Sequence, residues 1–425
     1  MDGAAIFALK MALGLWLVHR GLSHISDDDF ARTVIAERFA HAPHLDPSGT
    51  SWLPFPFWIT GATMMAFGRS LAVARAVALT LSGVGAVLAY GALRIARVDR
   101  LTSLAGVLLA MATPWNAWLG AATVPEGFTG AFVAAAAIIA GSSPRARTSV
   151  GAVLFCASLA RYEVWPACFV VTVVALARTR PLLSRASLMA LVPMVGPAAW
   201  MAWNLHAHGS ATHFLDRVTA YRQAVGAAGA PLMEKLLVYP RALFGAPEVL
   251  LVAAVGLMAF AFAPEMRRRW WLPLAVALAT LLFLVYGETK EGAPTHHPER
   301  ALVAIWWILA PFGIDGAREL VARLTLRPSY GAVNAVCVAV AALGWNVTQP
   351  GAWDLFLEEH MGEASRAVQL ARGQELRASG ATHLVVTPCA YEHFALIAAY
   401  GAPEQVELRP TEHNPLFREC PKVER

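Results

Sequence analysis

Apolar runs separated by short polar segments recur along almost the whole chain. A helix needs about 20 apolar residues to cross the hydrocarbon core of a bilayer. We therefore expect eleven membrane-spanning helices, several of them short enough to be re-entrant or half-buried segments. They lie near residues 4–19, 71–93, 101–114, 125–140, 149–160, 164–177, 186–205, 247–263, 271–286, 301–314 and 330–346. Residues 55–67 are also apolar, but Pro54 and Pro56 open them and Gly68 closes them, so we place them at the membrane interface.

The composition agrees with a polytopic, α-helical membrane protein. Of the 425 residues, 57% are hydrophobic and 15% are charged, whereas soluble proteins carry about 25% charged residues. The net positive charge comes from loop arginines and does not indicate nucleic-acid binding. No small-residue cleavage site follows residues 4–18, so we expect an uncleaved first span. Within it, Lys10 should face the bundle or snorkel to the surface, because lipid-facing charge is costly.

Loop charges predict the orientation. One set of loops holds 14 Lys and Arg in 45 residues: 94–100, 141–149, 178–185, 264–270 and 315–328. The alternate set holds 10 in 103 residues: 20–54, 115–124, 161–163, 206–246 and 287–300. Cytoplasmic loops carry the excess of positive charge, so the second set should face outward. All thirteen histidines fall on this outer side or at its boundary, which favours a polar site there.

Residues 347–425 differ in composition from the predicted membrane domain, residues 1–346. Their pattern predicts a small extracytoplasmic α/β domain, with helices at 362–379 and 391–400 and strands at 382–387 and 406–408. A unit of this size is only marginally stable alone, so we expect it to dock on the outer loops. Cys389 and Cys420 could form a disulfide if this end faces an oxidising space.

The polar stretch after the first span contains three consecutive carboxylates, Asp27, Asp28 and Asp29. Consecutive residues of a helix point about 100° apart, so all three cannot face one ligand. Crowded carboxylates repel, which can raise the pKa of one of them and fit it for general-base catalysis. The alternative is structural: residues 30–40 look helical, and Asp is favoured just before a helix.

This order of features resembles the GT-C superfamily, polytopic glycosyltransferases that use lipid-phosphate-linked sugars. The closest likeness is to the branch that contains protein mannosyltransferases and aminoarabinose transferases. An acidic outer loop follows the first span, and a short motif precedes the second. The motif is carried by Phe67, Gly68, Ser70, Ala74 and Arg75. The likeness covers roughly residues 1–180 and, more weakly, 287–315.

The resemblance implies that one carboxylate of the outer loop is the catalytic base. The family usually shows two acidic residues where this chain has three, so the pair is Asp27 with Asp28 or Asp28 with Asp29. Asp28 belongs to both pairs and is our first choice, followed by Asp29 and Asp27. The resemblance also implies a polyprenyl-phosphate sugar as donor, transfer with inversion, and no soluble nucleotide or other cofactor.

A second polar segment precedes the tenth predicted span and contains His296, His297 and Arg300. It resembles the His and Glu-x-Arg element that GT-C enzymes place before a late span. The planar fork of Arg suits a phosphate group, and the histidines could protonate a leaving phosphate. A divalent metal at the two histidines is an alternative, although adjacent histidines need further ligands to chelate one ion. Structural anchoring is the third interpretation.

Further candidates lie at other predicted outer boundaries. Arg161 could contact the donor phosphate, or it could simply pair with Glu163. Tyr162 and Glu163 are candidates for substrate binding. Glu126 begins a predicted helix, where an acidic residue also complements the helix dipole. Trp52 could stack on a sugar, or it could belong to the aromatic belt at the membrane surface.

The sequence therefore predicts a multi-pass glycosyltransferase of the inner, or plasma, membrane, with its site on the extracytoplasmic face. Its partners would be the lipid-linked donor, membrane lipids, and a glycan, lipid or protein acceptor, with no nucleic acid. Mannose is one candidate sugar. A transporter or flippase is the alternative, but transporters need ionisable residues near the bilayer midplane, and the predicted spans have almost none. A non-catalytic scaffold would leave the polar segments without a role.

Overall fold

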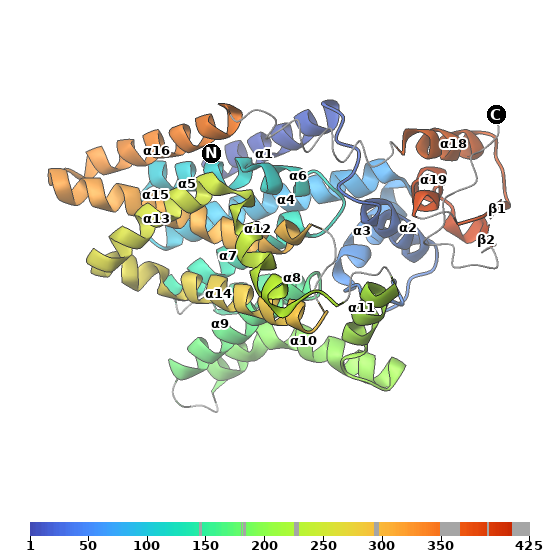
Figure 1. The fold of residues 1–425 in the computed structure, drawn as a ribbon, viewed down its shortest axis with the longest axis horizontal. Coiled ribbons are helices and arrows are strands. Elements are labelled where there is room, and N and C mark those ends of the chain that lie inside the picture. Colours follow the sequence, from blue (N-terminus) through green and yellow to red (C-terminus); the bar gives the residue numbers. More distant parts are fainter. Residues whose placement is uncertain are drawn as a thin grey trace.

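The computed structural model describes residues 1–143, 147–179, 181, 184–224, 229–292, 297–348, 366–388 and 391–409. The described chain forms a helical bundle, elongated in Figure 1, with α2, α3 and the C-terminal elements gathered at one end. The first half comprises α1 (Asp2–His19), α2 (Asp28–His41), α3 (Phe55–Phe67), α4 (Leu71–Ile95), α5 (Arg100–Ala112), α6 (Pro114–Leu119), α7 (Glu126–Ser142), α8 (Arg147–Ser158), η2 (Tyr162–Val164) and α9 (Trp165–Ala177).

The second half continues with longer helices and ends in a small α/β unit. It comprises α10 (Arg185–His208), α11 (His213–Ala224), α12 (Leu232–Ala242), η3 (Leu243–Gly245), α13 (Pro247–Phe262), α14 (Pro264–Thr289), η4 (Pro298–Leu302), α15 (Val303–Thr325), α16 (Pro328–Thr348), α18 (Ala367–Ala378), β1 (Leu384–Val386), α19 (Glu392–Tyr400), η5 (Pro403–Gln405) and β2 (Val406–Leu408).

Six helices among the described residues are long and apolar enough to cross a membrane: α1, α4, α10, α14, α15 with η4, and α16. The segment of α12, η3 and α13 would add a seventh, with a bend of 93° between its two halves. The other four predicted spans coincide with α5, α7, α8 and α9, which are shorter apolar helices. The count of eleven spans therefore stays a prediction.

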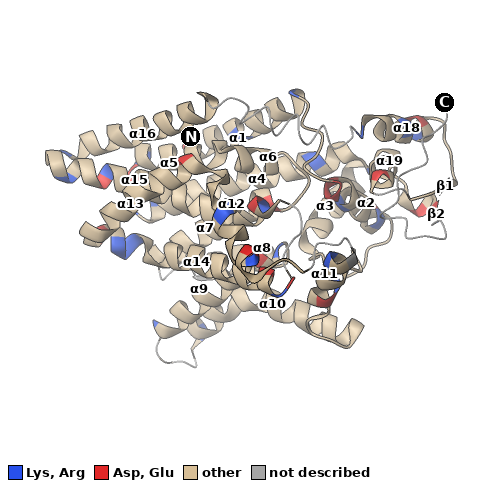
Figure 2. Cartoon of the chain, viewed as in Figure 1, with Lys and Arg blue, Asp and Glu red and all other residues tan. Residues whose placement is uncertain are grey.

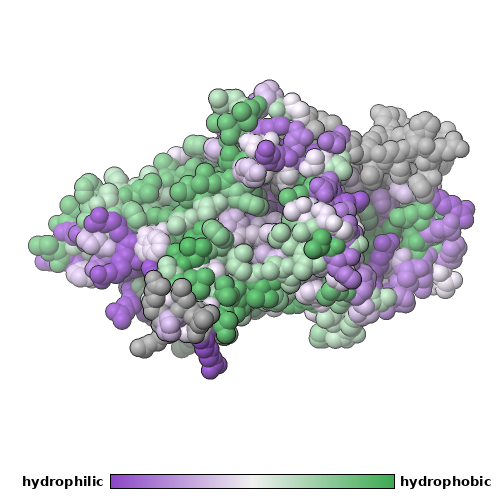
Figure 3. Space-filling model, turned by 90° about the horizontal axis from the view of Figure 1, so that it is seen from below, coloured by the Kyte–Doolittle hydropathy of each residue, from purple (hydrophilic) through white to green (hydrophobic). Residues whose placement is uncertain are grey.

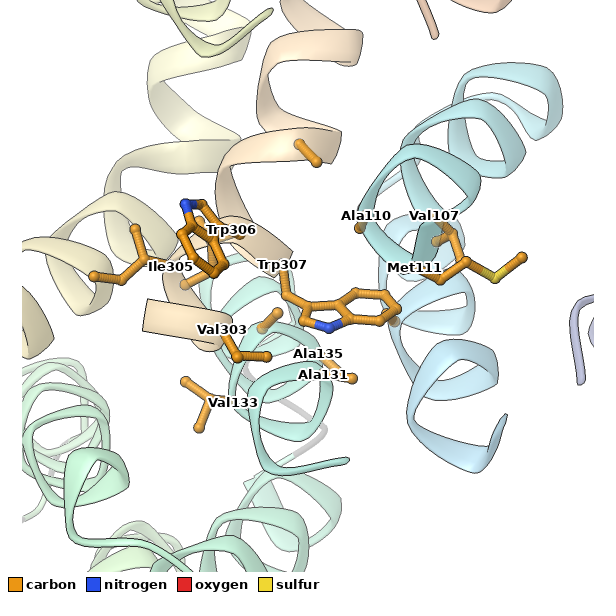
Figure 4. Packing of buried hydrophobic residues seen from close by; sticks show 14 of the residues in the cluster. Val107, Ala110, Met111, Ala131, Val133, Ala135, Val303, Ile305, Trp306 and Trp307 are labelled. Atoms are coloured by element: carbon orange, nitrogen blue, oxygen red, sulfur yellow. The ribbon is translucent and has the colours of Figure 1, made fainter. Parts of the chain in front are cut away.

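The bundle core forms around α7 and α15. Helix α7 is buried on nearly all sides from Glu126 to Ile138, and it packs against α4, α8, α14 and α15. Figure 4 shows Trp307 of α15 lying between α5 and α7. Small residues allow close helix crossings, as is usual in membrane bundles. At Gly313, for example, a Cβ atom would overlap the backbone of Val252 in α13.

Surface polarity matches a membrane protein. Figure 3 shows a hydrophobic belt between hydrophilic regions at the two ends of the molecule. In Figure 2 most of the length of each long helix is uncharged. Charged residues gather at one end of the bundle and around α2, α11 and α12. Lys10 is an exception within α1. It faces the bundle, is 2% exposed, and donates hydrogen bonds to the carbonyls of Met111 and Asn116 at 3.3 and 2.9 Å, where α5 gives way to α6.

The C-terminal elements, residues 366–388 and 391–409, are called the C-terminal module below. Its strands β1 and β2 pair in parallel, with Leu384 opposite Val406, and its helices α18 and α19 pack on each other. Its standing as a separate domain stays a prediction. Helix α19 docks on α2, where Phe30 and Val34 share a hydrophobic cluster with three α19 residues, Ala395, Ile397 and Ala398. Cys389 and Cys420 lie outside the described residues.

The apolar segment predicted at 55–67 is α3, with the same bounds. Pro54 and Pro56 lie at its start, where proline fits because the first helical N–H groups lack intrahelical partners. The helix ends at Gly68, whose φ of 91° is readily adopted only by glycine. Helix α3 packs against α2, so it forms one wall of the region that holds the acidic turn.

Candidate active site

The site is centred on an ion cluster between the start of α2, the start of α7, the turn before α9, and η4. Glu126 is 2% exposed. Its Oε1 accepts from Arg300 Nε at 2.9 Å and lies 2.7 Å from Arg300 Nη2. Arg161 Nη1 lies 3.1 Å from the same oxygen. One buried carboxylate therefore joins two guanidiniums that lie 139 positions apart in the sequence.

Arg161 is held on its other side by Glu163. Its Nε donates to Glu163 Oε2 at 3.1 Å, and its Nη2 pairs with Oε1. Burial alone would lower the pKa of Arg161, but Glu126 and Glu163 more than offset it and raise the pKa above its ordinary value. Arg161 therefore stays protonated at ordinary pH, and its N–H groups point mainly to the carboxylates of Glu126 and Glu163.

The three aspartates at the start of α2 point to three different partners, as the helical rotation between them requires. The Oδ2 of Asp28 accepts from Arg300 Nη1 at 3.2 Å, and its side chain is 40% exposed. Asp28 is therefore the member that combines contact with the ion cluster and access from outside.

Asp29 is fully buried and ties α2 to the loop before α7. Its Oδ1 accepts from the backbone N–H of Thr123 at 2.7 Å and from the Thr123 hydroxyl at 3.0 Å. Its Oδ2 accepts from the N–H groups of Ile25 and Ser26, at 3.0 and 3.4 Å. These bonds place the start of α2 beside the start of α7, and so place Asp28 beside Glu126.

Asp27 faces the C-terminal module and forms a bidentate pair with Arg366, at 2.9 and 2.8 Å. It occupies the N-cap position of α2, but its side chain makes no capping hydrogen bond. The structural alternative considered for the aspartates, a helix cap, therefore does not describe Asp27. Asp29 instead accepts hydrogen bonds from the backbone N–H groups of Ile25 and Ser26, just before the helix.

Arg32, which the sequence did not single out, lies one helical turn after Asp28 and is 5% exposed. Its guanidinium carbon lies 4.5 Å from the centre of the Trp52 ring. Its Nε and Nη1 are buried and have no hydrogen-bond partner among the described residues. Burial lowers the pKa of Arg32 to about 10, with Glu126 and Asp28 acting in the opposite direction. Arg32 follows Asp28 by four residues, which places both side chains on one helix face. This spacing was the signal in the sequence that could have identified Arg32.

A mostly apolar cleft adjoins Arg32. Its walls come from α2, α3, α4 and the start of α7, and it is lined by Arg32, Thr33, Pro56, Phe57, Thr60, Ala74, Val77, Ala78, Leu81, Thr123, Val124 and Phe128. The Arg32 guanidinium, with its unused N–H donors, thus lies at the side of this mostly apolar cleft. This combination suits an amphiphile with an anionic head.

The remaining predicted residues have supporting positions. The hydroxyl of Tyr162 donates to the carbonyl of Ser51 at 2.7 Å and accepts from the indole of Trp200 at 3.0 Å. Trp52 lies against Arg32. His297 is near Trp115, with ring centres 5.8 Å apart, and its carbonyl accepts from the Arg300 N–H. His296 lies outside the described residues.

Two features bear on a metal or on other chemistry. No cluster of three or more His, Cys, Asp or Glu with metal-site geometry occurs among the residues that the structure describes. The candidate active site instead contains three guanidiniums, of Arg32, Arg161 and Arg300, and three carboxylates, of Asp28, Glu126 and Glu163. A site of this kind can hold a phosphate and offer a carboxylate as a base.

The fold is that of a polytopic, α-helical membrane protein. The structure is similar to the crystal structure of ArnT from Cupriavidus metallidurans bound to undecaprenyl phosphate, with a TM-score of 0.59. The alignment covers 96% of this chain and 89% of that chain, at 12% sequence identity. No protein-family model matches the sequence, and no curated protein matches it significantly. The likeness confirms the mostly helical, polytopic membrane fold that the sequence predicted.

Replacing Glu126 by Gln should destabilise the protein more than replacing Glu163 by Gln. Gln keeps the size of Glu126 but removes the charge that two buried guanidiniums share, and breaking a buried pair costs about 3 kcal/mol. Among the ion pairs of the described residues, Glu163 pairs with one guanidinium, that of Arg161. The unfolding midpoint of both variants, measured in the same detergent, checks this. Equal midpoints would contradict the central place of Glu126.

Proposed function

We propose that this protein is an integral membrane glycosyltransferase that moves a sugar from a polyprenyl-phosphate donor to an acceptor on the extracytoplasmic face. The observation that carries the proposal is that Asp28 and Arg32 lie on the same face of α2. An accessible carboxylate and a guanidinium with unused donors lie one turn apart, beside an apolar cleft. The fold supports it, since ArnT in the matching structure is bound to undecaprenyl phosphate.

Arg32 is the residue we assign first to the donor phosphate. Arg300 and Arg161 direct most of their donors to Glu126, Asp28 and Glu163, whereas two nitrogens of Arg32 have no partner among the described residues. Phosphate oxygens would satisfy these nitrogens, and the isoprenoid chain would enter the apolar cleft. Arg300 and Arg161 add positive charge at close range. His297 and His296 stay candidates for contact with the phosphate on the sequence argument alone.

Asp28 is the residue we assign as the base. It takes the proton from an acceptor hydroxyl or amine as the acceptor atom bonds to the anomeric carbon. The bond from that carbon to the phosphate oxygen breaks, and the electron pair leaves with polyprenyl phosphate, whose charge the guanidiniums stabilise. Attack from the face opposite the phosphate inverts the anomeric carbon. Asp29 and Asp27, engaged with Thr123 and Arg366, hold the turn in place.

Glu126, Tyr162, Glu163 and Trp52 form the surroundings of the substrates in this proposal. Glu126 and Glu163 fix the arginines, Tyr162 fixes the loop that carries Trp52, and Trp52 supports the plane of Arg32. Mannose remains the candidate sugar, and a glycan, lipid or protein the candidate acceptor. Loop charges support an outward-facing site, and we place the protein in the inner, or plasma, membrane.

The transporter alternative loses its main sequence support. Lys10 lies near the middle of the first predicted span, residues 4–19. In the structure its amine is used by two backbone carbonyls at the junction of α5 and α6. A group fixed in this way secures the bundle and is a poor candidate for coupling to a transported ion.

Replacing Asp28 by Asn should lower the transfer rate by about 10² to 10⁴, the range typical of a lost general base. Donor binding should change little. Purified wild-type and variant proteins can be compared with a panel of radiolabelled polyprenyl-phosphate sugars and crude membrane acceptors. Arg38→Gln, an exposed change on the same helix, serves as the control. Full activity of the Asp28 variant would remove this residue as the base.

Replacing Arg32 by Gln should weaken binding of a polyprenyl phosphate by about 10- to 100-fold, because charge-assisted hydrogen bonds each contribute about 1.5–3 kcal/mol. The affinity can be measured with undecaprenyl phosphate in mixed detergent micelles, again beside Arg38→Gln. If the affinity is the same in wild-type and Arg32 variant proteins, the phosphate does not lie against Arg32.

A further inference from the structure

Arg366 of the C-terminal module forms an ion pair with the acidic turn of α2. Its Nε and Nη2 bind the two oxygens of Asp27 at 2.9 and 2.8 Å. The side chains are only 10% and 19% exposed. Arg and carboxylate in this fork geometry make the most directional of charged contacts, so the pair fixes the orientation of Asp27 as well as its position.

Arg366 is itself held from behind by α19. Its Nη1 donates to Glu392 Oε1 at 2.8 Å, and the other oxygen of Glu392 accepts from Gln369 of α18 at 2.8 Å. Glu392 is the first residue of α19. The chain of contacts therefore runs from the two module helices through Glu392 and Arg366 to Asp27. A network of this kind restricts the guanidinium to one rotamer.

The module also packs directly on α2. Phe30 and Val34, which lie three and seven residues after Asp27, are buried with Ala395, Ile397 and Ala398 of α19. Helices α18 and α19 are themselves in close contact, since a Cβ atom on Gly373 would overlap the carbonyl oxygen of Leu396. The polar contact at Asp27 thus lies at the edge of a packed apolar interface.

Two anchors therefore flank the proposed base. Asp29 is fixed by Thr123 from the membrane bundle, and Asp27 is fixed by Arg366 from the C-terminal module. Because side chains in a helix are about 100° apart, fixing the residues on both sides sets the direction in which Asp28 points. That direction leads to Arg300.

We propose that Arg366 is a positioning residue, by which the C-terminal module orients Asp28 for catalysis. This inference rests on the function proposed above. When Arg366 is absent, Asp27 loses its bidentate partner, and the first turn of α2 loses one of its two anchors. Undocking of the module would therefore switch the site off without touching the donor cleft.

The same interface contains a second ion pair that serves as a control. Arg69, in the turn between α3 and α4, pairs with Glu404 of the module at 2.6 Å, and Arg377 donates to the Arg69 carbonyl at 3.0 Å. This pair also ties the module to the remainder of the protein. It makes no contact with Asp27, Asp28 or Asp29 among the interactions of the described residues.

The first arm of the experiment compares Arg366→Met with Arg69→Met in the full-length protein. Misplacing a catalytic group by about 1 Å can cost up to 10²-fold in rate. We expect kcat to fall by about 10- to 100-fold for Arg366→Met, with the KM for the donor within about twofold of wild type. Arg69→Met should retain kcat within about twofold. Equal losses in both variants, or a loss confined to KM, would overturn the positioning role.

The second arm asks whether Arg366 acts through Asp27. Asp27→Asn and the double variant Asp27→Asn with Arg366→Met complete a double-mutant cycle. If the pair acts as a unit, the double variant should lose no more kcat than the worse single variant. Losses that multiply would show that Arg366 acts by another route and would overturn the proposal.

The third arm does not depend on enzymatic activity. Hydrogen exchange in residues 26–31 reports the order of the acidic turn, and we expect it to rise at least fivefold in Arg366→Met but not in Arg69→Met. If the wild-type protein transfers no sugar from any donor, the proposed function fails, and this arm still decides whether Arg366 orders the turn. Unchanged exchange in Arg366→Met would overturn the inference even in an active enzyme.

Discussion

The arrangement of the site depends on one buried carboxylate, that of Glu126. A guanidinium is stable in a dry interior only when it is paired and hydrogen-bonded, and Glu126 supplies that partner to both Arg300 and Arg161. It lies at the start of α7, a helix that the bundle encloses on nearly all sides. The core of the bundle therefore fixes the segment before α15, the turn before α9 and, through Arg300, the acidic turn of α2.

Around this cluster the polar residues separate into two groups. Those bound on all sides, such as Asp29 and Arg161, determine geometry. Asp28 and Arg32 retain exposure or unused donors, and these are the residues to which we assign chemistry. Their separation by one helical turn gives the site a direction, with the phosphate and lipid chain on the side of Arg32 and the acceptor on the accessible side of Asp28. The C-terminal module completes the frame through Arg366 and Asp27.

Sequence reasoning predicted the helical membrane fold because apolar periodicity is a local property. It also indicated the helices and strands of the C-terminal module, and it selected Glu126, Arg161, Asp28 and Arg300, which the structure brings together. It did not find Arg32, since a charged residue in an amphipathic helix is usually solvated. It also could not assign the three aspartates to different partners, because Thr123, Arg300 and Arg366 come close to them only through tertiary packing. The eleven spans stay a prediction, since α5, α7, α8 and α9 are shorter than the thickness of a bilayer.

The central claim is that a lipid phosphate lies against Arg32 with its hydrocarbon chain in the adjoining cleft. A cryo-electron microscopy structure of the protein with undecaprenyl phosphate tests this most directly. The account predicts phosphate oxygens within hydrogen-bond distance of Arg32 Nε and Nη1, and the chain between α2, α3 and α4. A phosphate bound elsewhere, with the cleft beside Arg32 empty, would contradict it.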